Sequence, residues 1–276
     1  MEPIRVMING LPGNMSQVVL RHALRDSRFT LLPYSLTGPE ITDPEFRQEG
    51  QTIQLLHPDD RDEAIGEIRS SAGDFISIDF THPSAVNDNA VFYCSNALPF
   101  VMGTTGGDRK KLEASVTASS IAAVIAPNMA KQIVGFQAMM EYAANTFPKL
   151  FEGYTLAVKE SHQQGKADTS GTAKAMVKYF NALGTPFKEE DIVKERDPEN
   201  QQNRWGIPAG YLRGHGWHTY SLLSADQTVR FEFTHNVNGR EIYAGGTLDA
   251  VVFLHKKLAQ GASGKTFTMI DVLTGA

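Results

Sequence analysis

The sequence of 276 residues contains one cysteine, Cys94, so no disulfide can form within the chain. The lack of a disulfide framework suits a reducing compartment. Cys94 is interpreted as a small apolar helix residue rather than as a nucleophile. The N-terminus does not show the order of a signal peptide, in which a basic segment is followed by an apolar segment and then by small residues. The sequence also has no run of about 18 apolar residues, the length that a membrane-spanning helix needs. We therefore expect a cytoplasmic protein, or a plastid stromal one without its transit peptide, and no membrane partner.

A basic surface is also missing, because the formal net charge is -5 and the isoelectric point is about 5.9. Proteins that bind nucleic acid without sequence preference use clustered Lys and Arg to neutralise phosphates. This class is therefore excluded, and a small molecule is the expected partner. An anionic substrate would need a local group of donors, since the overall field repels it mildly.

The first half of the chain alternates short apolar segments with helical patterns of ten to fifteen residues. Such alternation predicts right-handed crossovers and a Rossmann-like, doubly wound parallel sheet. The expected strands are residues 4–8, 29–34, 52–55, 75–80, 100–102 and 122–125. Each ends in a loop of small or polar residues, and ligands bind at that edge of such sheets.

After Asn128 the pattern changes to a long helix over 131–146 and alternating segments at 154–160, 217–223 and 229–236. These predict an α+β domain with a mostly antiparallel or mixed sheet. The charged stretch 189–202 is expected to be a surface loop or arm. We expect residues 1–128 to bind the dinucleotide, with 247–276 packing back as a helix, and 129–246 to bind substrate and form a homo-oligomer.

The turn after the first expected strand reads Gly10-Leu11-Pro12-Gly13-Asn14-Met15. Backbone N–H groups there can hold a pyrophosphate at the start of a helix. The strict G-x-G-x-x-G pattern would need glycines at positions 12 and 15, so a tight turn without ligand stays an alternative.

The loop after the second strand reads Pro33-Tyr34-Ser35-Leu36-Thr37-Gly38 and lacks the acidic residue that bonds the ribose of NAD. Ser35 and Thr37 are expected to donate to a 2′-phosphate. We therefore expect NADPH as cofactor, with NADH possible.

The richest stretch is 159–173, which reads KESHQQGKADTSGTA. His162 has an unperturbed pKa near neutrality and can deliver a proton, and Lys166 can meet a carboxylate. Ser170, Gly171 and Thr172 open a helix, where N–H groups and hydroxyls bind anions. A Ser or Thr cap and a lone His are each more often structural. Together they indicate a small carboxylated substrate that receives hydride and a proton.

This stretch resembles the signature of the dihydrodipicolinate reductase family, in which a His, a Lys four residues later and Asp-x-Ser-Gly-Thr-Ala recur. The resemblance is closest to its plant and cyanobacterial branch and continues along the chain in the family's order. The further matches are Asp79-Phe80-Thr81 with Pro83, Gly103-Thr104-Thr105-Gly106, Ala126-Pro127-Asn128, Thr234-His235-Asn236, Arg240 and Tyr243-Ala244-Gly245-Gly246-Thr247. Two departures are Gln163 in place of a second His and His82 in place of an Arg.

The resemblance implies reduction of 4-hydroxy-tetrahydrodipicolinate, through dihydrodipicolinate, in diaminopimelate and lysine biosynthesis, by a tetramer or dimer. It implies His162 as the proton donor and Lys166 as a substrate-binding and catalytic cation. The implied substrate-binding residues are Ser170, Gly171, Thr172, Thr104 and Gln163. The implied cofactor-binding residues are Gly10, Gly13, Asn14, Met15, Phe80, Thr81, Gly103, Thr105, Asn128 and Met129, beside Ser35 and Thr37.

Two other functions stay open at this point. One is an NAD(P)-dependent reductase of another small dicarboxylic or amino acid, since a fold does not fix a substrate. The other is a dinucleotide-binding protein without turnover, which the presence of His162 and Lys166 disfavours. His215, His218 and His235 lack an accompanying Cys or acidic ligand at a typical spacing, so no metal is expected.

Overall fold

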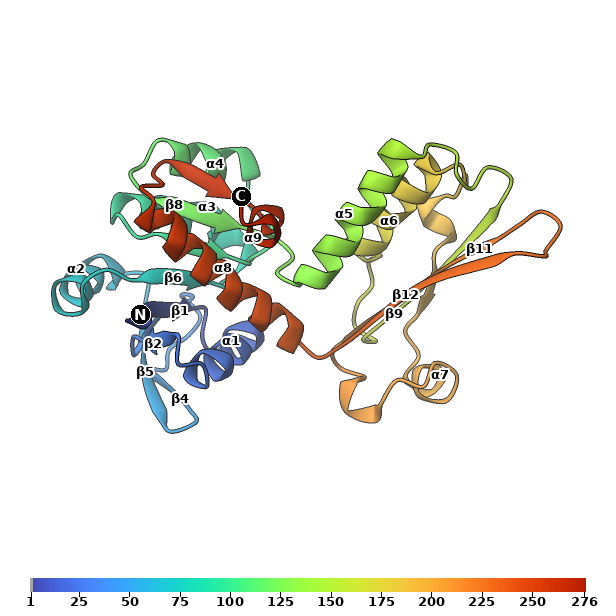
Figure 1. Cartoon of the computed structure of the whole chain (residues 1–276). Helices are drawn as coiled ribbons and strands as arrows, with labels where there is room; N and C mark the ends of the chain where they lie inside the picture. The colour runs from blue at the N-terminus through green and yellow to red at the C-terminus, as the bar shows by residue number, and fades with distance from the viewer. Residues whose placement is uncertain (1) are drawn as a thin grey trace. The chain divides into compact units, whose positions relative to one another are not determined.

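The computed structural model describes residues 2–276 (Figure 1), which divide into two compact units. The first consists of the chain up to Val134 together with residues 241–276, and the second of residues 135–240. The first unit is thus built from both ends of the chain. Each unit is described by itself.

The first unit is built on a six-stranded parallel sheet, which confirms the predicted Rossmann-like fold. Strands that follow one another in sequence do not all pair, because helices carry the chain across the sheet. From edge to edge the strands are β13 (Lys265–Phe267), β8 (Ala122–Ile125), β7 (Phe100–Met102), β6 (Ile76–Asp79), β1 (Ile4–Asn9) and β2 (Phe29–Leu31).

Both faces of this sheet are buried, as β1 illustrates. Ile4, Val6 and Ile8 point into one apolar core, and Met7 points into the other. Alternate side chains of a strand face opposite sides, so a strand buried on both faces needs a continuous apolar run. The first core includes α1 (Asn14–Leu24), α8 (Glu241–Ala259) and α9 (Met269–Thr274); the second includes α2 (Arg61–Ala72), α3 (Val86–Ser95) and α4 (Arg109–Thr117).

The expected single strand over 29–34 is wrong, because the chain leaves the main sheet at Pro33. Proline has no N–H to continue a ladder of hydrogen bonds. The next strand, β3 (Tyr34–Leu36), pairs instead with β5 (Gln51–Leu56) in a separate three-stranded sheet completed by β4 (Glu45–Gln48). Sequence reasoning missed β4 and β13, since short, partly exposed strands carry little apolar periodicity.

The second unit is a mixed four-stranded sheet in the order β10-β9-β11-β12, which confirms the predicted kind of domain. β11 is antiparallel to both neighbours, whereas β10 runs parallel to β9. Side chains of α5 (Lys131–Thr146) and α6 (Gly171–Ala182) share an apolar core with the sheet. The strands are β9 (Thr155–His162), β10 (Val193–Glu195), β11 (His215–Leu223) and β12 (Arg230–Asn238).

The stretch 189–202 is not the loop that its charge predicted. It holds a 3-10 turn (Glu189–Asp191), the edge strand β10 and a short helix, α7 (Pro198–Asn203), capped by the Asp197 side chain. Ile192 and Gln201 are buried and anchor it. Two further 3-10 turns, Pro83–Ala85 and Ala209–Tyr211, complete the elements. None of the helices within residues 2–276 has the length and apolar character needed to cross a bilayer.

Candidate active site

The first functional region is the carboxyl edge of the parallel sheet. Asn9 pairs in register with Asp79, which pairs in turn with Met102. The residues after these strands, Gly10, Phe80 and Gly103, therefore lie side by side. A Cβ on Gly10 would lie 2.3 Å from the Phe80 carbonyl oxygen, and one on Gly103 would lie 2.2 Å from the Phe80 ring. Only glycine allows this close packing, and Gly10 also has φ +98°.

Gly13 follows as the N-cap residue of α1 and contributes no side-chain cap. The start of the helix, where the predicted residues Asn14 and Met15 lie, thus presents backbone N–H groups and the positive end of the helix dipole. Such a terminus fits a pyrophosphate. This is the local chemistry that the incomplete glycine motif predicted.

Ser35 and Thr37 hold this loop rather than extending freely toward a phosphate. The buried Ser35 hydroxyl accepts a hydrogen bond from the Leu11 N–H at 3.2 Å and donates to the Leu36 carbonyl. The Thr37 hydroxyl donates to the Leu11 carbonyl oxygen at 2.9 Å. Both hydroxyls thus stabilise this loop, and their donation to a 2′-phosphate stays a prediction.

A buried hydrogen-bond network centred on Asp79 was missed by sequence reasoning. One Asp79 carboxyl oxygen accepts bonds from the Thr104 hydroxyl at 2.6 Å and from the Thr81 hydroxyl at 2.8 Å. The other accepts from Asn89 and from the Tyr93 hydroxyl. Burial, followed by the nearby Asp79 charge, raises the pKa of Tyr93 well above its usual value. The carboxyl group thus joins the end of β6 to α3 and to the loop after β7 beneath the edge.

Thr104, predicted to bind substrate, belongs to this network: it is buried and its hydroxyl donates to Asp79. The neighbouring predicted residue Thr105 is exposed. At the end of β8, the Asn128 side chain accepts a bond from the Ala130 N–H. The Met129 carbonyl packs where a Cβ on Gly246 would lie, only 1.7 Å away. Gly246 in α8 is therefore required for the backbone to pass.

The second functional region lies in the other unit, around the buried side chain of Glu160 at 0% exposure. Glu160 is on β9, and its Oε2 accepts the N–H of Ser170, the N-cap residue of α6. The Ser170 hydroxyl in turn accepts the Thr172 N–H. The carboxyl group thereby fixes the start of α6 beside the end of β9, and brings the predicted Ser170, Gly171 and Thr172 close to His162.

Arg196, between β10 and α7, is the second anchor of this region. Its guanidinium forms an ion pair with Glu160 and donates to the Lys166 carbonyl oxygen at 2.8 Å. Lys166 itself forms an ion pair with the exposed Asp168 at 2.8 Å. Because Arg196 holds the carboxyl group and the loop backbone together, the segment 163–169 is tied to the sheet. The charged stretch that seemed a surface arm supplies this residue.

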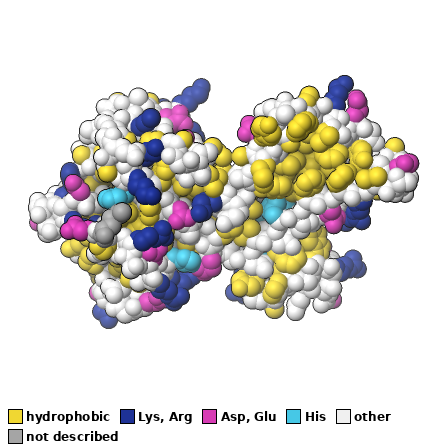
Figure 2. All heavy atoms as spheres, in the orientation of Figure 1, with side chains coloured by type: hydrophobic (Ala, Val, Ile, Leu, Met, Phe, Trp, Pro, Cys, Tyr) yellow, Lys and Arg dark blue, Asp and Glu magenta, His cyan; other side chains and the backbone are white. Residues whose placement is uncertain are grey.

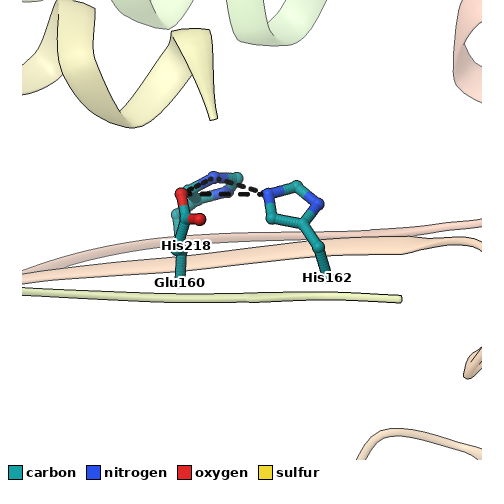
Figure 3. A group of neighbouring side chains, drawn as sticks. All are labelled: Glu160, His162 and His218. Atoms are coloured by element: carbon teal, nitrogen blue, oxygen red, sulfur yellow. Dashed lines mark hydrogen bonds and ion pairs between the residues drawn. The ribbon is translucent and has the colours of Figure 1, made fainter. Parts of the chain in front are cut away.

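His162 is fixed by hydrogen bonds at both ring nitrogens. Its Nδ1 donates to the His215 carbonyl oxygen at 3.1 Å, so in the neutral ring Nε2 is the acceptor. His218 Nε2 lies 3.3 Å from His162 Nε2. Figure 3 shows the two rings and the Glu160 carboxyl group converging above the sheet. His218 was not predicted to act here.

The other two histidines have separate surroundings. His215 donates from Nδ1 to the Tyr211 carbonyl oxygen and accepts the Ser161 hydroxyl at Nε2, so both its nitrogens are occupied. The His235 ring stacks on His218 with centroids 4.6 Å apart. The set His215, His218 and His235, considered from the sequence, therefore does not present three free ligand atoms.

The structure corrects the expected protonation of His162. Burial above all, opposed by the Glu160 charge and reinforced by Arg196, lowers the pKa of His162 to about 4. Burial also lowers the pKa of His235 to about 4 and that of His218 well below its usual value. These rings are therefore neutral at pH 7 in the free protein, and a proton on His162 requires an added negative charge nearby.

We expect the protein to lose stability in mild acid because of these histidines. Unfolded His binds a proton near pH 6.5, whereas His162 and His235 bind one near pH 4 when folded. Between these pH values the unfolded state binds more protons than the folded state. The free energy of unfolding therefore falls by about 1.4 kcal/mol for each such His and for each unit by which the pH is lowered. Urea unfolding at pH 7 and pH 5 measures the loss. His235→Gln should reduce the slope, and an unchanged slope would contradict the assignment.

The chain combines two features: a parallel-sheet edge that suits a dinucleotide, and a histidine beside an anion-binding helix terminus. Together they define an NAD(P)-dependent oxidoreductase of the Rossmann type. The comparisons give the family. Residues 4–129 match the N-terminal part and residues 132–273 the C-terminal part of dihydrodipicolinate reductase, so the chain belongs to the dihydrodipicolinate reductase family.

Named relatives cover nearly the whole chain. "Probable 4-hydroxy-tetrahydrodipicolinate reductase 1, chloroplastic" of Oryza sativa subsp. japonica is 44% identical over 97% of this chain and 78% of its own length. "4-hydroxy-tetrahydrodipicolinate reductase 1, chloroplastic" of Arabidopsis thaliana is 44% identical over 98% and 78%. The fold is similar to that of a dipicolinate-bound dihydrodipicolinate reductase from Paenisporosarcina sp. TG-14, with a TM-score of 0.65, 18% identity and coverage of 96% and 97%.

Proposed function

We propose that the protein reduces 4-hydroxy-tetrahydrodipicolinate, through dihydrodipicolinate, to tetrahydrodipicolinate in diaminopimelate and lysine biosynthesis. Membership of the family and 44% identity to plant relatives of that name support this substrate. The single observation that carries the proposal is the arrangement of His162 beside Glu160 and the start of α6. It places a proton-transfer group next to an anion-binding helix terminus.

The substrate is a dianion, and the second unit offers positive groups for it. We assign carboxylate binding to Ser170, Gly171 and Thr172 at the start of α6, with Lys166 as the cation and Gln163 as a further polar contact. Glu160 holds the Ser170 N–H and the Ser170 hydroxyl holds the Thr172 N–H, so the Gly171 N–H and the two hydroxyls are the groups assigned to the substrate. Lys166 pairs with the Asp168 carboxylate in this structure. A substrate carboxylate that took the place of Asp168 would keep the Lys166 ammonium in an ion pair. The fixed donors orient the ring before reaction, which lowers the barrier without new covalent chemistry.

His162 is assigned as the proton donor. The ring is neutral in the free protein, because burial lowers its pKa to about 4. The two carboxylates of the substrate bring negative charge beside it, which raises the pKa and favours uptake of a proton at Nε2. Nδ1 stays bonded to the His215 carbonyl oxygen in both states. Binding and charging of the acid are thereby coupled.

The first unit is proposed to hold NADPH, with NADH possible. Reduced nicotinamide supplies the hydride that adds to ring C4 when the cofactor is bound. Gly10, Gly13, Asn14 and Met15 are assigned to the pyrophosphate, where α1 begins without a side-chain cap. Beside the nicotinamide we assign Phe80, Thr81, Gly103, Thr105, Asn128 and Met129, which follow β6, β7 and β8.

The test is oxidation of NADPH and NADH by the purified protein, followed by absorbance, with substrate made in situ from pyruvate and aspartate semialdehyde by the preceding synthase. Rapid oxidation that needs every component supports the function and ranks the cofactors. Binding of NADPH without turnover would overturn the substrate assignment. In that case other small dicarboxylic or amino acids would be tried, because the fold is shared among related reductases.

We also propose that the protein is a homo-oligomer, a dimer or a tetramer, formed through the second unit. Residues of and after α5 expose large apolar side chains, with Tyr142 67% exposed, and Figure 2 shows hydrophobic groups gathered on this unit. β12 is an edge strand with Phe231 exposed. Apolar patches of this kind mark interfaces. Light scattering should give a mass of at least two chains, and Tyr142→Lys should lower it.

The relatives from rice and Arabidopsis are named chloroplastic. We propose that this protein works in the cytoplasm, or in the plastid stroma if its source has plastids. Both compartments are reducing enough to keep Cys94 as a thiol. Burial raises the pKa of Cys94, which further limits its reactivity.

A further inference from the structure

Three potential metal ligands converge beside the proposed proton donor (Figure 3). His162 Nε2 lies 3.3 Å from His218 Nε2, and Glu160 Oε2 lies 4.0 Å and 3.8 Å from these two atoms. A point equidistant from all three is about 2.2 Å from each, close to the distances at which Zn²⁺ binds His nitrogen and carboxylate oxygen. The three atoms therefore surround a position of the right size without movement of the backbone.

Contacts outside the site orient two of the ligands, His162 and Glu160. His162 Nδ1 donates to the His215 carbonyl oxygen, which directs the Nε2 lone pair toward the shared position. In the free protein the Nε2–H of His218 donates to His162 Nε2, and binding of an ion would move that proton to His218 Nδ1, which has no hydrogen-bond partner among the described residues. An ion would replace the contact between the two Nε2 atoms. Glu160 is held on its other oxygen by Arg196.

Two features limit and define the site. The Arg196 guanidinium and the Lys166 ammonium are both positive, and each opposes a divalent cation. His162 is the most exposed of the three ligands, with 13% of its side chain exposed against 4% for His218 and 0% for Glu160. A site with three protein ligands and one open position is the usual form for zinc that keeps a water molecule or small ligand.

We propose that Glu160, His162 and His218 form a binding site for a transition metal ion such as Zn²⁺, and that an ion bound there inhibits the enzyme. The ion would occupy the Nε2 lone pair of His162 and prevent that nitrogen from carrying a proton. Metal binding depends only on the three ligands, whereas inhibition rests on the proposed function. The site thus makes the reductase sensitive to free zinc.

The experiment is titration of tag-free, chelator-washed protein with Zn²⁺ in competition with a chromophoric chelator, and with Co²⁺, whose visible bands report tetrahedral His and carboxylate ligands. We expect one ion per chain, and His218→Gln should weaken binding about 10-fold or more through loss of a ligand. His255→Gln, in α8 of the other unit, is the matched control and should bind as the unaltered chain does.

Equal binding by the His218→Gln variant, or no stoichiometric binding to the unaltered chain, would overturn the metal site. Zn²⁺ should also inhibit turnover over the same concentration range in which it binds, and bound dicarboxylate should compete with it. Binding without inhibition of an active enzyme would overturn the inhibitory role. If the protein shows no reductase activity, the binding result still stands or fails by itself.

Discussion

His162→Ala should lower the maximal rate of reduction about 10²-fold or more, because general acid catalysis contributes at least that much. The variant loses the only histidine of 159–173, the side chain assigned as the proton donor. The start of α6 is held by Glu160 and by its own Ser170 cap, so substrate binding should change less than the rate. Steady-state kinetics with separate kcat and KM values measure both.

The control for this variant is His255→Ala, which removes a histidine from α8 among residues at the amino ends of the strands. It should leave kcat unchanged. A His162→Ala variant with full kcat would remove His162 from the mechanism.

A second measurement separates an effect on chemistry from an effect on folding. When a dicarboxylate binds at pH 7, the unaltered chain should take up a proton from the buffer, and the His162→Ala variant should not. The sign follows from a pKa of about 4 in the free protein that rises on binding, so affinity falls as pH rises.

Arg196→Met should destabilise the protein by about 3–5 kcal/mol, because it leaves a buried charge without its partner. Glu160 has no exposed surface, and Arg196 forms its only ion pair with Lys or Arg in residues 2–276. The same change removes a hydrogen bond to the Lys166 carbonyl oxygen, which frees the loop that carries the substrate-binding cation. Urea unfolding measures the first effect and substrate KM the second.

Two further variants test whether the buried charge is the cause. Arg230→Met breaks an ion pair with Glu232 in which both side chains are exposed, and it should cost less than about 1 kcal/mol. Adding Glu160→Gln to Arg196→Met removes the unpaired charge and should restore part of the lost stability. A loss in Arg196→Met no larger than that in Arg230→Met would contradict the prediction.

Much of the fold could be predicted because local periodicity reports burial directly. β7 and β8 are wholly apolar, and β1 and β6 are apolar apart from Arg5, Asn9, Ser77 and Asp79, as is typical of strands covered on both faces. Residues 193–195 and 265–267 gave no such signal, since edge strands are half exposed and owe their pairing to neighbours distant in sequence. Pro33 was a usable signal in the sequence. Because proline has no N–H to continue a ladder of hydrogen bonds, it indicates that β2 ends before it and that β3 is a separate strand.

The candidate site was predicted only where its residues are close in sequence. His162, Lys166 and the Ser170 cap share one segment, so their types and spacing showed a pattern. Arg196 and His218 come from other elements and meet Glu160 only through the order of the strands. The lowered pKa of His162 could not be predicted from the sequence either. Its main cause is burial, which depends on the folded unit and not on the sequence motif.

The carboxyl group of Asp79 has a consequence for how this protein can change through evolution. It accepts hydrogen bonds from Thr81, Asn89, Tyr93 and Thr104, and Asn9 donates to the same tyrosine. Each carboxyl oxygen accepts from two of these side chains, so replacing one donor weakens the network, whereas replacing Asp79 removes the acceptor that all four share. These positions should therefore co-vary across homologues as a single group, with Asp79 tolerating change least.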